Sequence, residues 1–153
     1  MDTDGRTFMN ANSTALETLI DTTYDSIEGY RKASENAKTP ELKRILAEQA
    51  TKREHTLSML NAELTRIGGK LVTKGTAAGG LHRMWLEITN LFESGDKAAA
   101  QRVEEGEDYL AGKFEEALER TDLDPATRTV IQTALAEIRD GERMTDRLAE
   151  QYG

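Results

Sequence analysis

The chain has 153 residues, a formal charge of −8 and a sequence pI of about 4.9. This length is typical of one domain, and the negative charge argues against a surface that binds nucleic acid. Because there is no cysteine and there are only two histidines, disulfides and thiolate zinc sites are excluded and a histidine-rich metal centre is disfavoured. No apolar run suits a signal peptide or a membrane span, so we expect a cytoplasmic protein that binds no membrane.

Helical periodicity runs through most of the sequence, and no segment has the pattern of a strand. We expect residues 1–11 to be a disordered segment and residues 12–151 to form one domain. The predicted helices span, in chain order, residues 14–37, 40–67, 77–92 and 96–120, with a last helix from Pro125 onward. The residues that indicate helix starts are Thr14, Thr39, Pro40, Asp96, Asp124 and Pro125. Those that indicate helix ends are Gly68 and Gly95.

The lengths of the connections predict the topology. About two residues join the first two long helices and about four join the last two, so each pair is expected to be an antiparallel hairpin. Roughly thirty residues lie between the hairpins, including the short helix. A long crossover between two hairpins is the ferritin-like arrangement, and we therefore predict an all-α, ferritin-like four-helix bundle with an extra short helix in the crossover.

Polar side chains interrupt the apolar face of each long helix near its middle. Antiparallel neighbours bring their midpoints together, so we expect these residues to converge on one polar layer inside the bundle. We interpret it as a layer of ion pairs and hydrogen bonds in which Lys52 or Arg53 supplies the positive charge, because an unpaired buried carboxylate is strongly disfavoured. The predicted polar layer comprises Thr23, Gln49, Lys52, Arg53, Glu107 and Glu137, and Tyr24, Tyr30 and Tyr109 are candidates to hydrogen-bond into it.

Ferritin-like proteins hold metal at this same level, which leaves a second interpretation open. A di-iron site takes two glutamates and two Glu-x-x-His pairs. Here Lys52 replaces the glutamate of the pair that would end at His55, and Thr23 stands where a glutamate of the first helix would be needed. The alternative is a reduced iron or manganese site formed by His55, Glu104, Glu107, Glu137 and Asp140. A third arrangement leaves these charges solvated and unpaired.

The short crossover helix carries His82, Arg83 and Trp85. His82 and Trp85 are one helical turn apart and share a face, so His82 with Arg83 is a candidate site for an anion or a partner. In the alternative interpretation, Trp85 is the large apolar anchor that holds the crossover against the bundle.

Four short motifs in the chain resemble those of a known family. They are Glu28-Gly29-Tyr30-Arg31, Thr39-Pro40-Glu41-Leu42, Leu81-His82-Arg83-Met84-Trp85 and Glu104-Glu105-Gly106-Glu107-Asp108-Tyr109. With them, residues 12–151 resemble a bacterial ferritin-like four-helix-bundle family of unknown function. Arg53-Glu54-His55 and Gly106-Glu107 more distantly resemble segments of rubrerythrin helices. The resemblance implies the fold and, for some relatives, an association with stress responses. It implies no established activity. The peroxidase or oxidase chemistry of rubrerythrin is not carried over to this chain, because Thr23 and Lys52 align with two of the rubrerythrin glutamates.

Two classes of function follow. The first is a non-enzymatic cytoplasmic protein, stress-associated, that acts through an unknown protein partner or by self-association, for instance as a homodimer, without a cofactor. The second is a metal-binding ferritin-like protein that uses a reduced ligand set for redox chemistry or iron handling. Lys52, at the position of a metal-binding glutamate, favours the first class. Residues 96–153 carry 15 acidic and 8 basic side chains, so the second hairpin is the acidic half and is suited to a basic partner.

Overall fold

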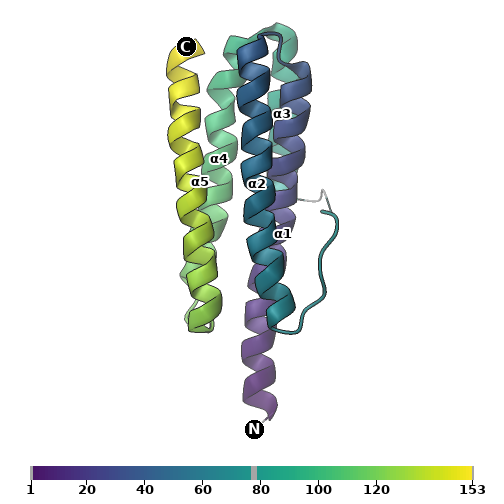
Figure 1. Cartoon of the computed structure of the whole chain (residues 1–153), viewed down its shortest axis with the longest axis vertical. Coiled ribbons are helices and arrows are strands. Elements are labelled where there is room, and N and C mark those ends of the chain that lie inside the picture. Colours follow the sequence, from purple (N-terminus) through teal and green to yellow (C-terminus); the bar gives the residue numbers. More distant parts are fainter. Residues whose placement is uncertain (1, 77–78, 153) are drawn as a thin grey trace.

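The chain is described by a computed structural model over residues 2–76 and 79–152, with the side chains of residues 2–10, 146, 149 and 152 not included in the description. Within these ranges the protein is all-α and has no strand, which confirms the predicted class (Figure 1). The helices are α1 (Asp2–Asn36), α2 (Pro40–Arg66), α3 (Gly80–Leu91), α4 (Asp96–Leu118) and α5 (Pro125–Tyr152), and a short 3-10 helix covers Phe92–Ser94. The start predicted for the crossover helix, residue 77, lies outside the described residues.

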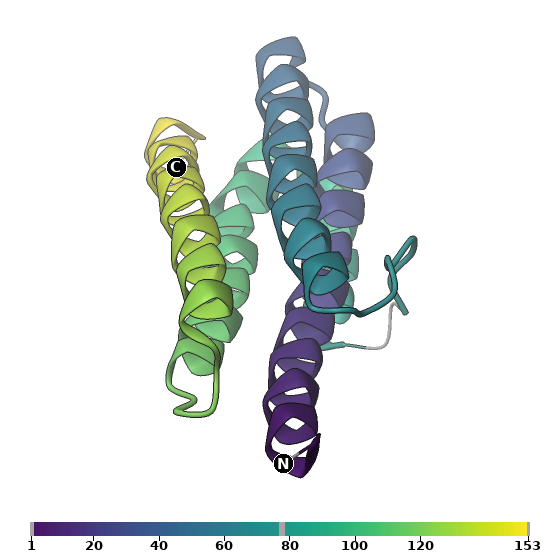
Figure 2. The same cartoon turned by 60° about the horizontal axis from the view of Figure 1, so that its bottom comes forward.

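The four long helices lie side by side, and α3 is roughly half their length (Figure 1). In this view α1 and α5 run upward while α2 and α4 run downward, so α1 with α2 and α4 with α5 are antiparallel pairs. Each pair is in extensive contact, and further contacts join α2 to α5, α1 to α4, and α3 to both α1 and α4. Between the pairs, the connection that follows α2 turns back beside the helices before α3 begins (Figure 2).

The turn between α1 and α2 is held by a residue from a distant part of the chain. Thr39 precedes α2 in an extended conformation, but its side chain makes no capping hydrogen bond. The carboxylate of Asp96 accepts the backbone N–H of Lys38 at 2.9 Å and that of Thr39 at 2.8 Å. Thr39 therefore occupies the predicted N-cap position of α2, although its side chain does not cap the helix. The prediction that Asp96 caps α4 was wrong. Gly95 precedes α4 instead, with a φ of 117° that glycine adopts without strain.

Helix α1 begins at Asp2, well before the predicted start at Thr14. Residues 2–11, which were expected to be disordered, belong to α1 in this structure. Asn12 is buried, and its side-chain oxygen accepts the backbone N–H of Asp124 at 3.0 Å. This contact ties the lower part of α1 to the turn between α4 and α5. A local capping pattern cannot reveal it, because the two residues are far apart in the sequence.

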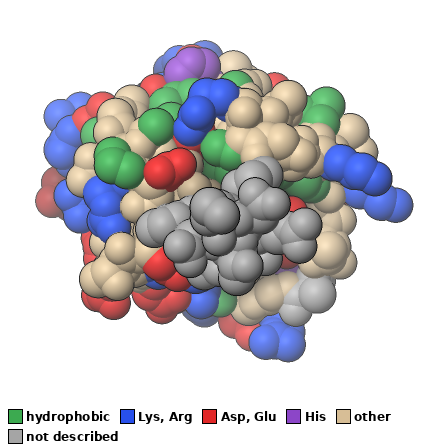
Figure 3. All heavy atoms as spheres, turned by 90° about the horizontal axis from the view of Figure 1, so that it is seen from below, with side chains coloured by type: hydrophobic (Ala, Val, Ile, Leu, Met, Phe, Trp, Pro, Cys, Tyr) green, Lys and Arg blue, Asp and Glu red, His purple; other side chains and the backbone are tan. Residues whose placement is uncertain are grey.

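Apolar side chains from all five helices form one continuous core, and those at its centre are fully buried. Among them are Leu16, Ile20, Leu46, Leu110 and Ile138. Acidic and basic side chains are interspersed over the visible part of the lower end of the molecule (Figure 3). Across the described ranges, every helix is too short or too polar to cross a membrane.

Candidate functional site

Polar residues from α1, α2 and α4 meet in the interior beside a glycine of α5. Tyr30 comes from α1, Gln49 and Arg53 from neighbouring turns of α2, and Glu107 from the middle of α4. All four side chains are at most 1% exposed, and Gly141 of α5 packs beside them. We call Tyr30, Gln49, Arg53 and Glu107 the Arg53–Glu107 cluster.

A carboxylate and a guanidinium are the charged groups of this cluster. The hydroxyl of Tyr30 donates a hydrogen bond to Oε1 of Glu107. Nη1 of Arg53 lies 3.9 Å from Oε2 of Glu107, and Nη2 donates to the backbone carbonyl of Glu137 at 3.2 Å. The distance of 3.9 Å is that of an ion pair, but it is too long for a direct hydrogen bond. The cluster thus balances a fully buried negative charge with a fully buried positive one.

Burial dominates the electrostatics of the cluster. It raises the pKa of Glu107 above its usual value, while the charge of Arg53 and the hydrogen bond from Tyr30 oppose the rise. Burial and the charge of Glu107 also hold the pKa of Tyr30 well above its usual value, so the phenol remains a hydrogen-bond donor. Beside the cluster, partial burial and the charges of Asp108 and Glu107 raise the pKa of Glu142 to about 7. Arg53 is therefore the group that makes a charged Glu107 tolerable in the interior.

Trp85 of α3 covers the cluster on one side. Its indole packs on the ring of Tyr30, with the ring centroids 4.7 Å apart and the planes tilted by 55°. Two helical glycines make room for it: a Cβ on Gly29 would lie 2.2 Å from the indole, and one on Gly106 would lie 3.1 Å from it. The structure thus places Trp85 as an anchor that holds α3 against α1 and α4.

The other two residues of the crossover motif lie away from the cluster. His82 is partly buried, and its Nδ1 is 4.0 Å from Oδ1 of Asp25 on α1. Arg83 is exposed. The nearby carboxylate of Asp25 would repel an anion, so the geometry does not favour the anion site predicted from His82 and Arg83.

The raised pKa of Asp25 should make the stability of the protein depend on pH. Burial and then the charge of Asp21 raise its pKa to about 6, although His82 lowers it in part. The ordinary value is about 3.9, so between about pH 4 and pH 6 the folded state binds the proton that the unfolded state has released. This contribution to stability is complete below about pH 4 and is lost as the pH rises through 6.

We therefore expect the free energy of unfolding of the natural protein, relative to that of the variant Asp25→Asn, to fall by about 2 kcal/mol between pH 4 and pH 7. Urea denaturation followed by circular dichroism at several pH values measures both proteins. The amide does not titrate, so the variant supplies the background from all other groups. A difference that stays constant with pH would contradict the assignment to Asp25.

Three residues of the predicted polar layer lie outside the cluster. Thr23 is fully buried, but its hydroxyl donates to a carbonyl of its own helix at 2.7 Å. Lys52 is exposed, because it precedes Arg53 by one position and so faces about 100° away from it. The carboxylate of Glu137 faces His55 at the surface, with Oε1 3.2 Å from Nδ1.

The residues of the alternative metal site are not brought together. The side chain of His55 is 65% exposed, Asp140 pairs with a neighbour on its own helix at the surface, and Glu104 is partly buried. Glu107 points into the Arg53–Glu107 cluster. Among the side chains that the structure describes, no group of three or more from histidine, aspartate or glutamate is placed to hold one metal ion.

Sequence reasoning overlooked Asp25, Gly29 and Gly106. The two glycines carry a signal that was available, because glycine in the interior of a helix is unfavourable and indicates a close contact. Asp25 carries none, since its burial depends on how the connection and α3 cover α1.

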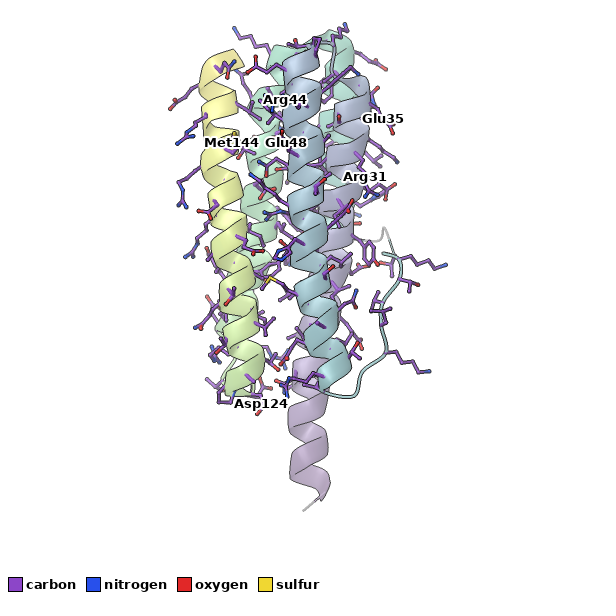
Figure 4. All side chains as sticks on the ribbon, in the orientation of Figure 1. Arg31, Glu35, Arg44, Glu48, Asp124 and Met144 are labelled. Carbon is purple, nitrogen blue, oxygen red and sulfur yellow. The ribbon has the colours of Figure 1, made fainter. Side chains whose placement is uncertain are left out.

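Charged side chains pair along the helix surfaces outside the interior. Arg44 and Glu48 form a pair at 2.8 Å on the outer face of α2, and Arg31 of α1 contacts Glu54 of α2 (Figure 4). A groove of about 710 Å³ lies between α1, α2 and the connection that follows α2. Its lining includes Asp25, Glu28, Glu35 and Glu54 as well as Arg31, Lys32 and Lys74. With both signs of charge present, the groove shows no preference for an anion or a cation.

The fold and the cluster together define an all-α protein with an ion pair at its centre. A comparison with protein families matches residues 11–120 to the family described as Domain of unknown function (DUF2383). The match spans more than two thirds of the chain, from α1 through α4, and the chain belongs to this family. It includes Tyr30, Arg53, Trp85 and Glu107. A search of curated proteins finds no match.

Proposed function

We propose that the chain is a ferritin-like four-helix bundle in which the Arg53–Glu107 cluster takes the place of a di-iron centre. We further propose that it acts in the cytoplasm as a non-enzymatic protein, through a protein partner or a second copy of itself. Two antiparallel helix pairs joined by a long crossover support the ferritin-like part of this proposal. The position of the Arg53–Glu107 cluster, at the centre of the helices, supports the proposal that this chain has no di-iron centre.

The observation that carries the proposal is the buried guanidinium of Arg53. A di-iron site gathers four glutamates and two histidines from four helices, because two highly charged cations need several anionic ligands. Within the cluster the acid is Glu107, and Arg53 lies 3.9 Å from it. A metal dication at this place would be repelled by the guanidinium, and one carboxylate would not offset both positive charges.

Metal analysis tests this proposal directly. The full chain is produced in medium supplemented with iron and manganese, and both metals are measured by mass spectrometry in the natural protein and in Glu107→Ala. We expect far less than one metal ion per chain in both proteins. A stoichiometric metal that is lost in Glu107→Ala would contradict the proposal and would support a reduced metal site for redox chemistry or iron handling.

For the contact surface we propose the acidic hairpin formed by α4 and α5. Its net charge of −7 over residues 96–153 favours a partner with a basic surface and disfavours nucleic acid. Affinity capture from stressed and unstressed cells, with sedimentation velocity over a range of concentrations, measures partner binding and self-association. Neutralising two exposed acids, Glu119→Gln with Glu150→Gln, should weaken binding to a basic partner, as should added salt. An absence of association in both experiments would contradict this mode of action.

A further inference from the structure

Several polar atoms of the Arg53–Glu107 cluster have no hydrogen-bond partner within the described part of the protein. They are Oε2 of Glu107, Oε1 of Gln49, and Nε and Nη1 of Arg53. Each belongs to a side chain that is at most 1% exposed, so bulk solvent does not reach it. Buried polar atoms are nearly always paired with protein or with an ordered water molecule.

Two of the unpaired atoms, Oε1 of Gln49 and Oε2 of Glu107, face a part of α5 that has no side chain. A Cβ placed on Gly141 would lie 3.2 Å from Oε1 of Gln49, 3.3 Å from Oε2 of Glu107 and 3.6 Å from Nη2 of Arg53. Groups from α2 and α4 therefore surround the position that a side chain at residue 141 would fill. Any other amino acid would place carbon there, next to two hydrogen-bond acceptors.

We propose that one water molecule is bound beside Gly141 and pairs three of these four atoms. It donates to Oε2 of Glu107 and Oε1 of Gln49, and it accepts a hydrogen bond from Nη1 of Arg53. The 3.9 Å between Nη1 and Oε2 is too long for a direct hydrogen bond, but it allows one water to lie about 2.9 Å from both atoms. Three polar partners are the usual number for a buried water.

The chemistry of the surrounding atoms selects water over an ion. An anion such as chloride would suit the guanidinium of Arg53, but it would be repelled by Oε2 of Glu107 and Oε1 of Gln49. A metal cation would suit those two acceptors, but Arg53 would repel it. A neutral molecule that both donates and accepts satisfies all three groups, and the space beside a glycine limits its size to that of water.

Bound water would also explain how the cluster links four helices. Glu107 is joined to α1 through Tyr30 and, by the water, to Arg53 and Gln49 on α2 and to the open face of α5. This site goes beyond the proposed function, and it does not depend on which partner the surface binds. Metal at the same place would be detected by the metal analysis described above, so the two proposals fail in different ways.

A crystal structure of the full chain, from crystals soaked in bromide, tests the identity of the ligand. The resolution must be high enough to show ordered water. We expect density of one water beside Gly141 without anomalous signal. Anomalous signal from bromide or a metal at this position would overturn the proposal. So would a direct contact between Arg53 and Glu107 with no density beside Gly141.

Variants of Gly141 test the same site in solution. Gly112, on α4, is the matched control, because nothing lies within 4 Å of a Cβ placed on it. Alanine favours a helix over glycine, so Gly112→Ala should raise the folding equilibrium constant about fivefold. In Gly141→Ala the methyl group displaces the water and leaves two acceptors unpaired, so we expect a constant about tenfold below that of the natural protein.

A third variant separates loss of the water from simple crowding. The hydroxyl of Gly141→Ser can take the place of the water, so this variant should be more stable than Gly141→Ala although its side chain is larger. Urea denaturation measures all three variants. The proposal would be overturned if Gly141→Ala were at least as stable as the natural protein, or if Gly141→Ser were no more stable than Gly141→Ala.

Discussion

Replacing Glu107 by alanine is expected to lower the free energy of unfolding by about 3 kcal/mol. The change leaves the guanidinium of Arg53, which is 1% exposed, without its counter-charge. It also removes the acceptor of the Tyr30 hydroxyl. Urea denaturation of the natural protein and of Glu107→Ala gives the difference. A loss below about 0.5 kcal/mol would mean that water already solvates these groups, contrary to their burial.

A double variant shows whether the unpaired charge is the cause. Arg53→Met with Glu107→Gln removes both charges, while the amide of glutamine still accepts the hydrogen bond from Tyr30. A buried pair replaced on both sides commonly costs little, whereas a pair broken on one side is strongly destabilised. The double variant should therefore be more stable than Glu107→Ala. If it were less stable, the loss would have to come from the packing of these side chains and not from their charges.

The predicted helices match the structure best where their boundaries depend on local chemistry. Pro40 and Pro125 begin α2 and α5 as predicted, because proline suits the first turn of a helix. Gly68 and Gly95 have φ values of 93° and 117°, the conformation in which glycine ends or precedes a helix. The role of Asp96 could not be predicted, since the N–H groups that it accepts lie 57 and 58 residues earlier in the chain.

The candidate site depends on helical phase, and this limits what the sequence can predict. Glu107 lies between Val103 and Leu110 at the spacing of a buried face, and the structure places it at 0% exposure. Lys52 and Arg53 are adjacent in sequence, so either could be the buried cation until the phase of α2 is known. The contacts that Gly141 makes possible involve α2, α4 and α5 together, and no pattern within one helix contains them.

The close packing of Trp85 on Gly29 likewise could not be predicted from the sequence. This packing leads to the second large effect that we expect. A Cβ on Gly29 would lie 2.2 Å from two indole atoms, a distance at which the ring has to move. Since Trp85 is 2% exposed and packs on Tyr30, a displaced indole loses buried apolar contacts and exposes the side of the Arg53–Glu107 cluster that it covers. Overpacking of this kind costs roughly 1–3 kcal/mol, and loss of a buried tryptophan costs more.

We therefore expect Gly29→Ala to lower the free energy of unfolding by about 3 kcal/mol, even though alanine is the better helix former. Gly112→Ala is the matched control and should be stabilising, because its Cβ meets no neighbour. Leucine at position 85 relieves the collision with the new Cβ. Trp85→Leu should therefore cost less free energy of unfolding in the Gly29→Ala variant than in the natural protein. Urea denaturation of the four proteins of this cycle measures the coupling. Independent effects of the two substitutions would contradict the close packing of Trp85 on α1, which is also what shields Glu107 from water on this side.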